Sequence, residues 1–301
     1  MIREHSSKHP DAPLFLYLPH QAVHVGNRPE KSHPQYALNQ APQEYIEQYA
    51  WVKDDQRRNL SAMVAVMDEA AGNITSVLKD VGMWNDTIFI FSTDNGGPIN
   101  DKASNFPLRG GKATLWEGGV RGVGFVAGGD LERFGFVGLP RVSQGLMHVS
   151  DWSETMCELA GGGCAAPRLP LDGVSAAGLL RGTSSLVSAS NRSEIVHELC
   201  RSWMGGSCAE HEGQYAAITQ GRYKLVVGQE GSAPPRLFDV LRDPGEQDDL
   251  APAQNKIVQE MLKRLDELAV EDATGWAHDR EAIDPRSDPR LHGGAWVPWM
   301  P

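Results

Sequence analysis

The sequence contains no long hydrophobic run and no excess of basic residues. Its apolar stretches fall well short of the roughly 20 residues that a membrane-spanning helix needs, so a membrane span is not expected. The 28 Lys and Arg residues are outnumbered by 39 Asp and Glu residues, and the formal net charge of −11 offers no basic field to attract a phosphate backbone. Nucleic acid is therefore not an expected partner. The polar opening, Met1–Pro13, lacks the apolar core of a signal peptide, so we expect no export signal in this stretch.

Cysteine is scarce, and its placement leaves two interpretations open. The four cysteines fall as two close pairs: Cys157 with Cys164, and Cys200 with Cys208. This spacing permits two short disulfide loops but is not that of a metal knuckle, and free buried thiols are an equally good interpretation. Asn-X-Ser/Thr sequons would accept glycans in a secretory pathway, although so short a pattern often arises by chance. They begin at Asn59, Asn73, Asn85 and Asn191.

The 301 residues have the composition of a globular protein, with 41% hydrophobic and 22% charged residues. Leu14–Leu18 is an apolar run between two prolines, which predicts a buried strand of a parallel sheet. Apolar residues at three- and four-residue steps over residues 59–79 predict an amphipathic helix that Gly82 ends. A second apolar run, Thr87–Phe91, completes a strand–helix–strand unit. The first part of the chain therefore has an α/β pattern.

The rest of the pattern indicates a larger domain over residues 1–180 and a small subdomain over residues 181–301. A strand at Gly122–Ala127 and a helix at Asp151–Leu159, capped by Ser150, are expected in the first. The second contains short strands and one helix, which predict an α+β unit with an antiparallel sheet. The strands are expected at residues 215–219, 223–227 and 237–240, and the helix over about residues 253–270.

Chemically useful side chains follow the two predicted strands of the first part. Because ligands of open α/β sheets bind beyond the carboxyl ends of the strands, His24 and the Asp94-Asn95 pair are candidate site residues. Asp94 and Asn95 offer oxygen ligands that suit Ca²⁺ or Mg²⁺. Two oxygens do not complete such a site, and from spacing alone a plain turn is the better interpretation. His24 suits a general acid or an anion ligand, and a structural histidine equally well.

A glycine-rich stretch with basic residues lies at residues 108–122. Its Arg109 and Lys112 are candidate anion ligands, although composition alone favours solvated charges on a flexible loop. Taken in order, four stretches of the chain resemble the sulfatases, most closely the arylsulfatase B-like branch. They are Phe15-Leu-Tyr-Leu-Pro-His-Gln-Ala-Val-His24, Phe91-Ser-Thr-Asp-Asn-Gly-Gly97, Pro107-Leu-Arg-Gly-Gly-Lys112 and Leu115-Trp-Glu-Gly-Gly-Val-Arg-Gly122.

The resemblance implies a sulfuric-ester hydrolase of the alkaline-phosphatase-like α/β fold, with a central, mostly parallel sheet, a Ca²⁺ ion and a formylglycine made from a cysteine. By position, Asp94 and Asn95 would be metal ligands. Lys112 would contact the sulfate and its bridging oxygen, and His24 would bind the sulfate and help protonate the leaving alkoxide. The substrate would be a sulfated glycan or a small sulfate ester. A full-length relative would be lysosomal or secreted, which gives more weight to the sequons.

The sequence departs from the family pattern before Leu14. Sulfatases carry there a strand that ends in paired aspartates, and then a helix with C-x-P-S-R whose cysteine becomes the formylglycine; this sequence has neither. Cys164 begins a looser match to that signature, but it follows Lys112 instead of preceding His24, so it is not expected to be the nucleophile. We therefore expect the C-terminal part of a sulfatase, with its central sheet incomplete at the N-terminal side and no activity alone.

Two other functions compete with this interpretation. One is a pseudoenzyme that kept the sulfate-facing side chains and binds calcium or a sulfated glycan without turnover. The other is a phosphomonoesterase or phosphodiesterase, since alkaline-phosphatase-like folds host several related transfers. The sequence around Lys112, and the absence of the extra His and Asp metal ligands that those enzymes use, argue against the second.

Overall fold

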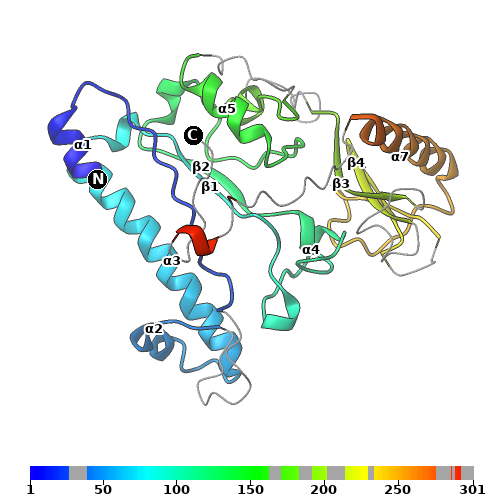
Figure 1. Ribbon diagram of the computed structural model, residues 1–301, viewed down its shortest axis with the longest axis horizontal. Helices are drawn as coiled ribbons and strands as arrows, with labels where there is room; N and C mark the ends of the chain where they lie inside the picture. Colours follow the sequence, from blue (N-terminus) through cyan, green and yellow to red (C-terminus); the bar gives the residue numbers. More distant parts are fainter. Residues whose placement is uncertain are drawn as a thin grey trace.

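The computed structural model describes residues 1–26, 39–162, 171–182, 192–201, 214–229, 234–275, 286 and 289–292. Figure 1 shows an elongated arrangement, with a long helix at one end and a four-stranded sheet at the other. The helices are α1 (Ile2–Lys8), α2 (Gln43–Gln48), α3 (Asp55–Asp80), α4 (Glu117–Val120), α5 (Asp151–Leu159), α6 (Ala177–Arg181) and α7 (Asn255–Gly275). The strands are β1 (Phe89–Ser92), β2 (Gly124–Ala127), β3 (Glu194–Arg201), β4 (Gln214–Gln220), β5 (Tyr223–Val227) and β6 (Arg236–Asp239). Short 3-10 turns lie at Trp84–Asp86, Ile99–Asp101, Leu131–Phe134 and Pro289–His292.

The long helix α3 confirms the periodicity seen over residues 59–79. It begins at Asp55, because the Asp54 carboxylate accepts a hydrogen bond from Arg57 N at 2.9 Å and so satisfies a free amide of the first turn. It ends where Gly82 adopts a positive φ of 75°, which glycine tolerates without steric cost. Its apolar face buries Leu60, Ala62, Met63 and Leu78.

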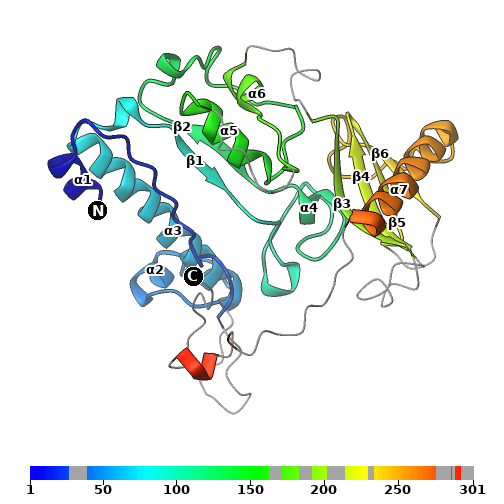
Figure 2. The ribbon, with the colours of Figure 1, turned by 45° about the horizontal axis from the view of Figure 1, so that its top comes forward.

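The sheet expected in the first part differs from the prediction. β1 and β2 pair antiparallel, with Phe89 opposite Ala127 and Ser92 opposite Gly124, and no parallel pair occurs among the described strands. The Leu14–Leu18 segment is not a strand: it has no ladder partner in the described chain, and Phe15 is 74% exposed. Figures 1 and 2 show it running beside α3. An apolar run becomes a buried strand only where a neighbour pairs with its backbone, and local sequence does not supply that neighbour.

The antiparallel sheet predicted for the second part of the chain is confirmed. Its strands pair in the order β3-β4-β5-β6, and a two-residue turn joins β4 to β5 with Gly221 at a φ of +58°. Helix α7 covers one face and packs Val258, Met261 and Leu265 onto the sheet. Leu115 and Trp116 from the first part cover the opposite face. Coverage of both faces explains why β5 is buried from Lys224 to Val227 without alternation.

The sequons and cysteines are only partly within the described residues. Asn73 on α3 and Asn85 are exposed, whereas the Asn59 amide donates to the buried Asn39 carbonyl at 2.9 Å. Cys157 and Cys200 are disulfide-bonded. Asn191, Cys164 and Cys208 lie outside the described residues, and the boundary between residues 180 and 181 stays a prediction. Within the part that the structure describes, every helix is too short or too polar to cross a membrane.

Candidate functional site

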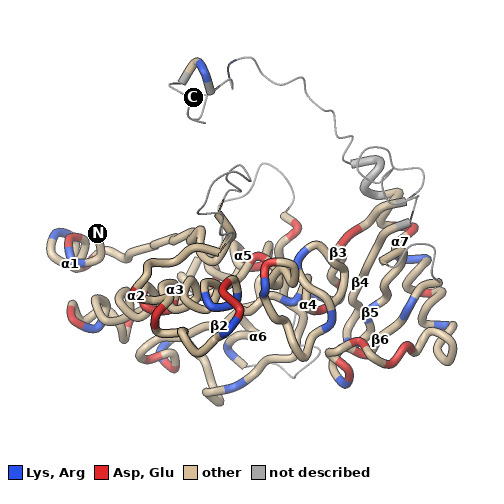
Figure 3. Tube along the Cα trace, turned by 90° about the horizontal axis from the view of Figure 1, so that it is seen from below, with Lys and Arg blue, Asp and Glu red and all other residues tan. Residues whose placement is uncertain are grey.

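Three segments of the first part of the chain meet at one backbone junction. They are the loop after β1 (residues 94–97), the loop of residues 105–112, and the first turn of α4. Gly96 N donates to Gly119 O at 2.9 Å, Gly118 N to Arg109 O at 2.7 Å, and Lys112 N to Gly97 O at 3.3 Å. Figures 1 to 3 place α4 between the β1–β2 pair and the four-stranded sheet. The structure thus brings the stretch with Asp94 and Asn95 to the stretch with Lys112.

Glycine is required at this junction because the backbones touch one another. A Cβ on Gly96 would lie 1.7 Å from Gly118 O, and a Cβ on Gly118 would lie 2.4 Å from Arg109 O. Both distances are too short for any side chain. The glycine-rich stretch is therefore a packed junction, whereas its composition had favoured a solvated, flexible loop.

The Asn105 side chain stabilises the junction through hydrogen bonds to its backbone, a role that the sequence did not predict. Its Nδ2 donates to Gly97 O at 2.8 Å and to Gly110 O at 3.0 Å, while its Oδ1 accepts from Gly97 N at 2.8 Å. One amide side chain can do this because it carries both donors and an acceptor. A lone asparagine in a loop gives no sequence signal of such a role, since the role depends on where the fold places the backbone of Gly97 and Gly110.

Asp94, Asn95 and Lys112 lie on the segments that form this junction. Asp94 is exposed, and one of its carboxylate oxygens accepts from Asn95 N at 2.9 Å. The Asn95 amide nitrogen donates to Gly96 O at 3.1 Å. The Lys112 side chain is exposed and forms no ion pair with any described residue. These side chains are held by a fixed backbone yet remain open to a ligand.

His24 lies in a segment that reaches the same region only indirectly. Its Nδ1 lies 2.9 Å from Val25 O, and its side chain is exposed. A Cβ added to Gly26, two residues after His24, would lie 3.5 Å from the Gln40 side chain, so the two segments are close. Asn39, which precedes Gln40, donates from Nδ2 to Asp101 O at 2.9 Å. The described contacts therefore lead from the His24 segment to the loop before Lys112, without joining His24 to Asp94 or Lys112.

A calcium ion would find ligands of the right kind here, but few of them. Carboxylate and amide oxygens are the donors that Ca²⁺ prefers, and Asp94 and Asn95 supply both types. Ca²⁺ takes six to eight oxygens, however, and the described residues contain no group of three or more His, Cys, Asp or Glu side chains arranged to hold a metal. Asp94 and Asn95 thus fit part of a calcium site and do not complete one.

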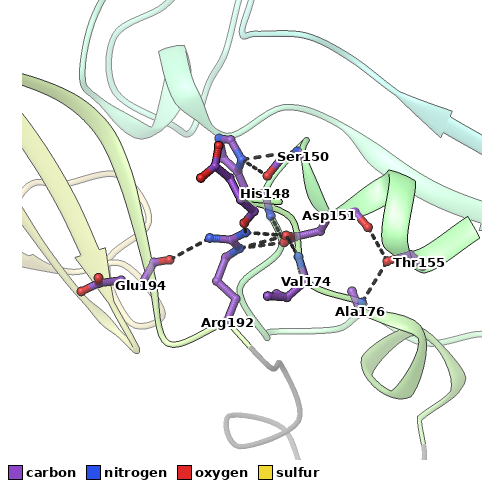
Figure 4. A network of polar contacts seen from close by, with 9 residues as sticks. His148, Ser150, Asp151, Thr155, Val174, Ala176, Arg192 and Glu194 are labelled. Atoms are coloured by element: carbon purple, nitrogen blue, oxygen red, sulfur yellow. Dashed lines mark hydrogen bonds and ion pairs between the residues drawn. The ribbon is translucent and has the colours of Figure 1, made fainter. Parts of the chain in front are cut away.

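A second polar network, centred on Asp151, joins the first part to the start of β3 (Figure 4). The fully buried Asp151 carboxylate accepts from Arg192 Nη2 at 2.5 Å, from His148 N at 2.7 Å and from Val174 N at 2.9 Å. Burial alone would raise the pKa of Asp151, but the Arg192 guanidinium and the two backbone amides outweigh it, so the pKa lies below its usual value. The network ties three chain segments together around one charge.

The same network corrects the expected helix cap at Ser150. The Ser150 hydroxyl makes no capping bond to α5 and instead lies 2.8 Å from His148 Nδ1. Burial, together with the nearby Arg192, lowers the pKa of His148. A cavity of about 190 Å³ lies beside Arg192 and Gln144–Leu146, and none of the predicted site residues lines it.

Replacing Asp151 with asparagine is expected to destabilise the protein by about 3 kcal/mol. The amide keeps the volume but has one accepting oxygen in place of two, so Arg192, His148 and Val174 cannot all keep their bonds to it. The partly buried Arg192 guanidinium also loses the negative charge of its closest carboxylate. Urea unfolding measures the change. Asp80→Asn, which removes an exposed partner of Arg3, is the control and should shift stability by less than about 0.5 kcal/mol. Small and similar changes in the free energy of unfolding of both variants would contradict the stabilising role assigned to Asp151.

Comparison with known proteins identifies the family. The sulfatase family model matches residues 2–162, which is more than half of the chain. The chain belongs to the sulfatase family. Among curated proteins it is similar to arylsulfatase J of Mus musculus, at 34% identity over 96% of this chain and 50% of that protein. The chain therefore spans about half the length of this curated relative.

Solved structures place the fold of this sulfatase-family chain. It resembles the crystal structure of Ps i-CgsB in complex with a neocarrahexaose, with a TM-score of 0.63, 21% identity, and 82% of this chain and 51% of that one covered. It also resembles BT4656 in complex with its substrate D-glucosamine-2-N,6-O-disulfate, with a TM-score of 0.54, 18% identity, and 74% and 42% covered. The fold is of the alkaline-phosphatase-like class of the structural neighbours.

Proposed function

We propose that the complete protein hydrolyses sulfate esters and that this chain supplies the loops that face the sulfate. The observation that carries the proposal is the backbone junction that holds the Asp94-Asn95 loop against the Lys112 loop, in a chain of the sulfatase family. Lys112, whose ammonium group forms no ion pair with a described residue, would meet the sulfate oxygens and stabilise the charge that grows on them in the transition state. His24 supplies a proton to the leaving alkoxide.

The proposed reaction also needs a Ca²⁺ ion and a formylglycine. Asp94 and Asn95 would contribute oxygens to a Ca²⁺ ion, which when bound withdraws charge from the sulfate. A formylglycine, expected outside this chain, would provide the nucleophile. Within the chain, the residues bind and orient the sulfate at Lys112 and move a proton at His24.

The proposed substrate class is a sulfated glycan or a small sulfate ester. BT4656, which shares the fold, was solved with a sulfated glucosamine as its substrate. A lysosomal or secreted location fits the exposed positions of Asn73 and Asn85, because a glycan needs a solvent-facing asparagine. Calcium dependence and glycosylation at these two sites are parts of the same proposal.

The test compares the complete coding sequence with this chain alone, both produced with formylglycine-generating machinery. Turnover of 4-nitrophenyl sulfate is measured with 4-nitrophenyl phosphate as the competing substrate. We expect the complete protein to hydrolyse the sulfate and the chain alone to be inactive. Preference for the phosphate would favour a phosphoesterase. Calcium or sulfated-glycan binding by the complete protein without any turnover would favour a pseudoenzyme.

A further inference from the structure

A buried charge cluster connects the small subdomain to the loop that carries Lys112. Lys224 on β5 places its Nζ 2.9 Å from one carboxylate oxygen of Glu117 and 3.0 Å from one of Glu246. The side chains of Lys224 and Glu246 are fully buried, and that of Glu117 is 8% exposed. Arg121 reaches the other Glu117 oxygen at 3.7 Å. Glu117 belongs to α4, whereas Lys224 and Glu246 belong to the subdomain.

Glu246 also binds both ends of the segment that contains Lys112, which runs from Arg109 to Glu117. Its second carboxylate oxygen accepts from Glu117 N at 2.6 Å, and its backbone carbonyl accepts from Arg109 Nη1 at 3.3 Å. The Arg109 guanidinium lies 3.8 Å from the centre of the Trp116 ring, and Trp116 packs edge-on against Phe238 of the sheet. The segment from Arg109 to Glu117 is therefore clamped onto the subdomain.

This cluster is a costly way to obtain stability alone. Burial raises the pKa of Glu246, because the ionised carboxylate loses its water, and the Lys224 ammonium only partly offsets this. Replacing a buried ion pair by apolar groups is often neutral for stability, and in some proteins such a pair serves instead to define a geometry. Here the defined geometry is the path of the backbone between Arg109 and Glu117.

We propose that Glu246 and Lys224 are positioning residues, through which the small subdomain fixes the Lys112 loop in the orientation that sulfate-ester hydrolysis requires. Neither side chain contacts the proposed site, so both act through the loop. Glu246 holds the two ends of the segment that contains Lys112, and Lys224 holds Glu246 against Glu117. This inference rests on the proposed function for its kinetic test only, since the clamp itself can be measured without substrate.

The kinetic test is a double-mutant cycle in the complete protein, with kcat/KM for 4-nitrophenyl sulfate as the readout. Glu246→Ala is expected to lower kcat/KM about a hundredfold, the effect of displacing a site group by about 1 Å. In a Lys112→Ala background the same substitution should lower it by less than about threefold, because the group it positions is already gone. Equal factors in the two backgrounds would show a general structural effect and overturn the proposal.

Two further variants separate positioning from folding. Glu246→Gln keeps an oxygen for Glu117 N, so it should recover kcat/KM to within about tenfold of the unmodified protein. Glu194→Ala is the matched control, because Glu194 pairs with Arg264 at 2.8 Å inside the same subdomain and touches no residue of the clamped segment. It should leave kcat/KM within about twofold. Failure of Glu246→Gln to recover the rate, or an equal loss with Glu194→Ala, would contradict the proposal.

Hydrogen exchange of the unmodified chain gives a readout that needs neither activity nor a folded variant. The amides of Glu117 and Gly118 are expected to exchange as slowly as those of β4 and β5, because the clamp opens only when the subdomain detaches. Exchange at these amides as fast as in exposed loops would overturn the positioning role. If the clamp is protected but the complete protein turns over no sulfate ester, the proposed function fails while the clamp stands.

Discussion

Replacing Lys112 with alanine in the complete protein is expected to lower kcat/KM for sulfate esters about a thousandfold, or roughly 4 kcal/mol of transition-state stabilisation. The ammonium group is exposed, has no ion-pair partner among the described residues, and extends from a backbone that is bonded to Gly97 O. A fixed backbone keeps this charge near the sulfate, where it stabilises the negative charge that grows on the sulfate oxygens. Steady-state kinetics with 4-nitrophenyl sulfate measure the loss.

The control for this prediction is a lysine that carries the same charge elsewhere. Lys263→Ala on α7 removes an exposed ammonium that pairs with Glu267 at 3.4 Å, and it should leave kcat/KM unchanged. Circular dichroism verifies that both variants fold. Full activity of Lys112→Ala would refute the role assigned to Lys112. An equal loss in both variants would mean that overall charge, and not position, matters.

Much of the fold follows from local sequence, and the exceptions have a common cause. Helix α3 and the β4–β5 hairpin were predictable because periodicity, a capping residue and a turn glycine all lie within the segment itself. The Leu14–Leu18 strand was wrong because a strand depends on a partner elsewhere in the chain. Ser150 occupies the N-cap position of α5 as predicted, but its hydroxyl makes no capping bond because it lies against His148 instead.

The candidate site shows the same division. The glycine-rich stretch and the Asp94-Asn95 pair were visible as sequence patterns, and the structure places them at one junction. The clamp on the Lys112 loop was not visible, because the Glu117–Lys224 pair joins positions 107 residues apart and the Glu117–Glu246 bond joins positions 129 residues apart. Nothing near Glu117 in sequence indicates that its partners are a buried lysine and a second carboxylate. Long-range polar contacts of this kind emerge only from the fold.

The protein is expected to lose stability as the pH falls below 6.5, mainly because of His197. This histidine on β3 lies 2.8 Å from the Thr219 hydroxyl, and burial, with the charges of Lys224 and His148 nearby, lowers its pKa from 6.5 to about 3. The unfolded chain therefore binds a proton between pH 6.5 and 3 that the folded chain does not. Stability is fully present above pH 6.5 and is lost progressively down to pH 3, by about 1.4 kcal/mol per pH unit and about 5 kcal/mol in total.

The measurement is the urea midpoint of unfolding between pH 7 and pH 5, above the range in which the carboxylates with lowered pKa, Asp151 and Glu194, begin to titrate. Over this interval the free energy of unfolding should fall by about 2 kcal/mol. His197→Gln retains a donor for the Thr219 hydroxyl but has no proton to bind, so most of the slope should disappear. A smaller remainder belongs to His148, whose pKa is also lowered by burial, and to Glu246, whose raised pKa acts in the opposite direction. An unchanged slope in His197→Gln would show that His197 is protonated without resistance in the folded protein, and that it lies in a wetter environment than the one between β3 and β4.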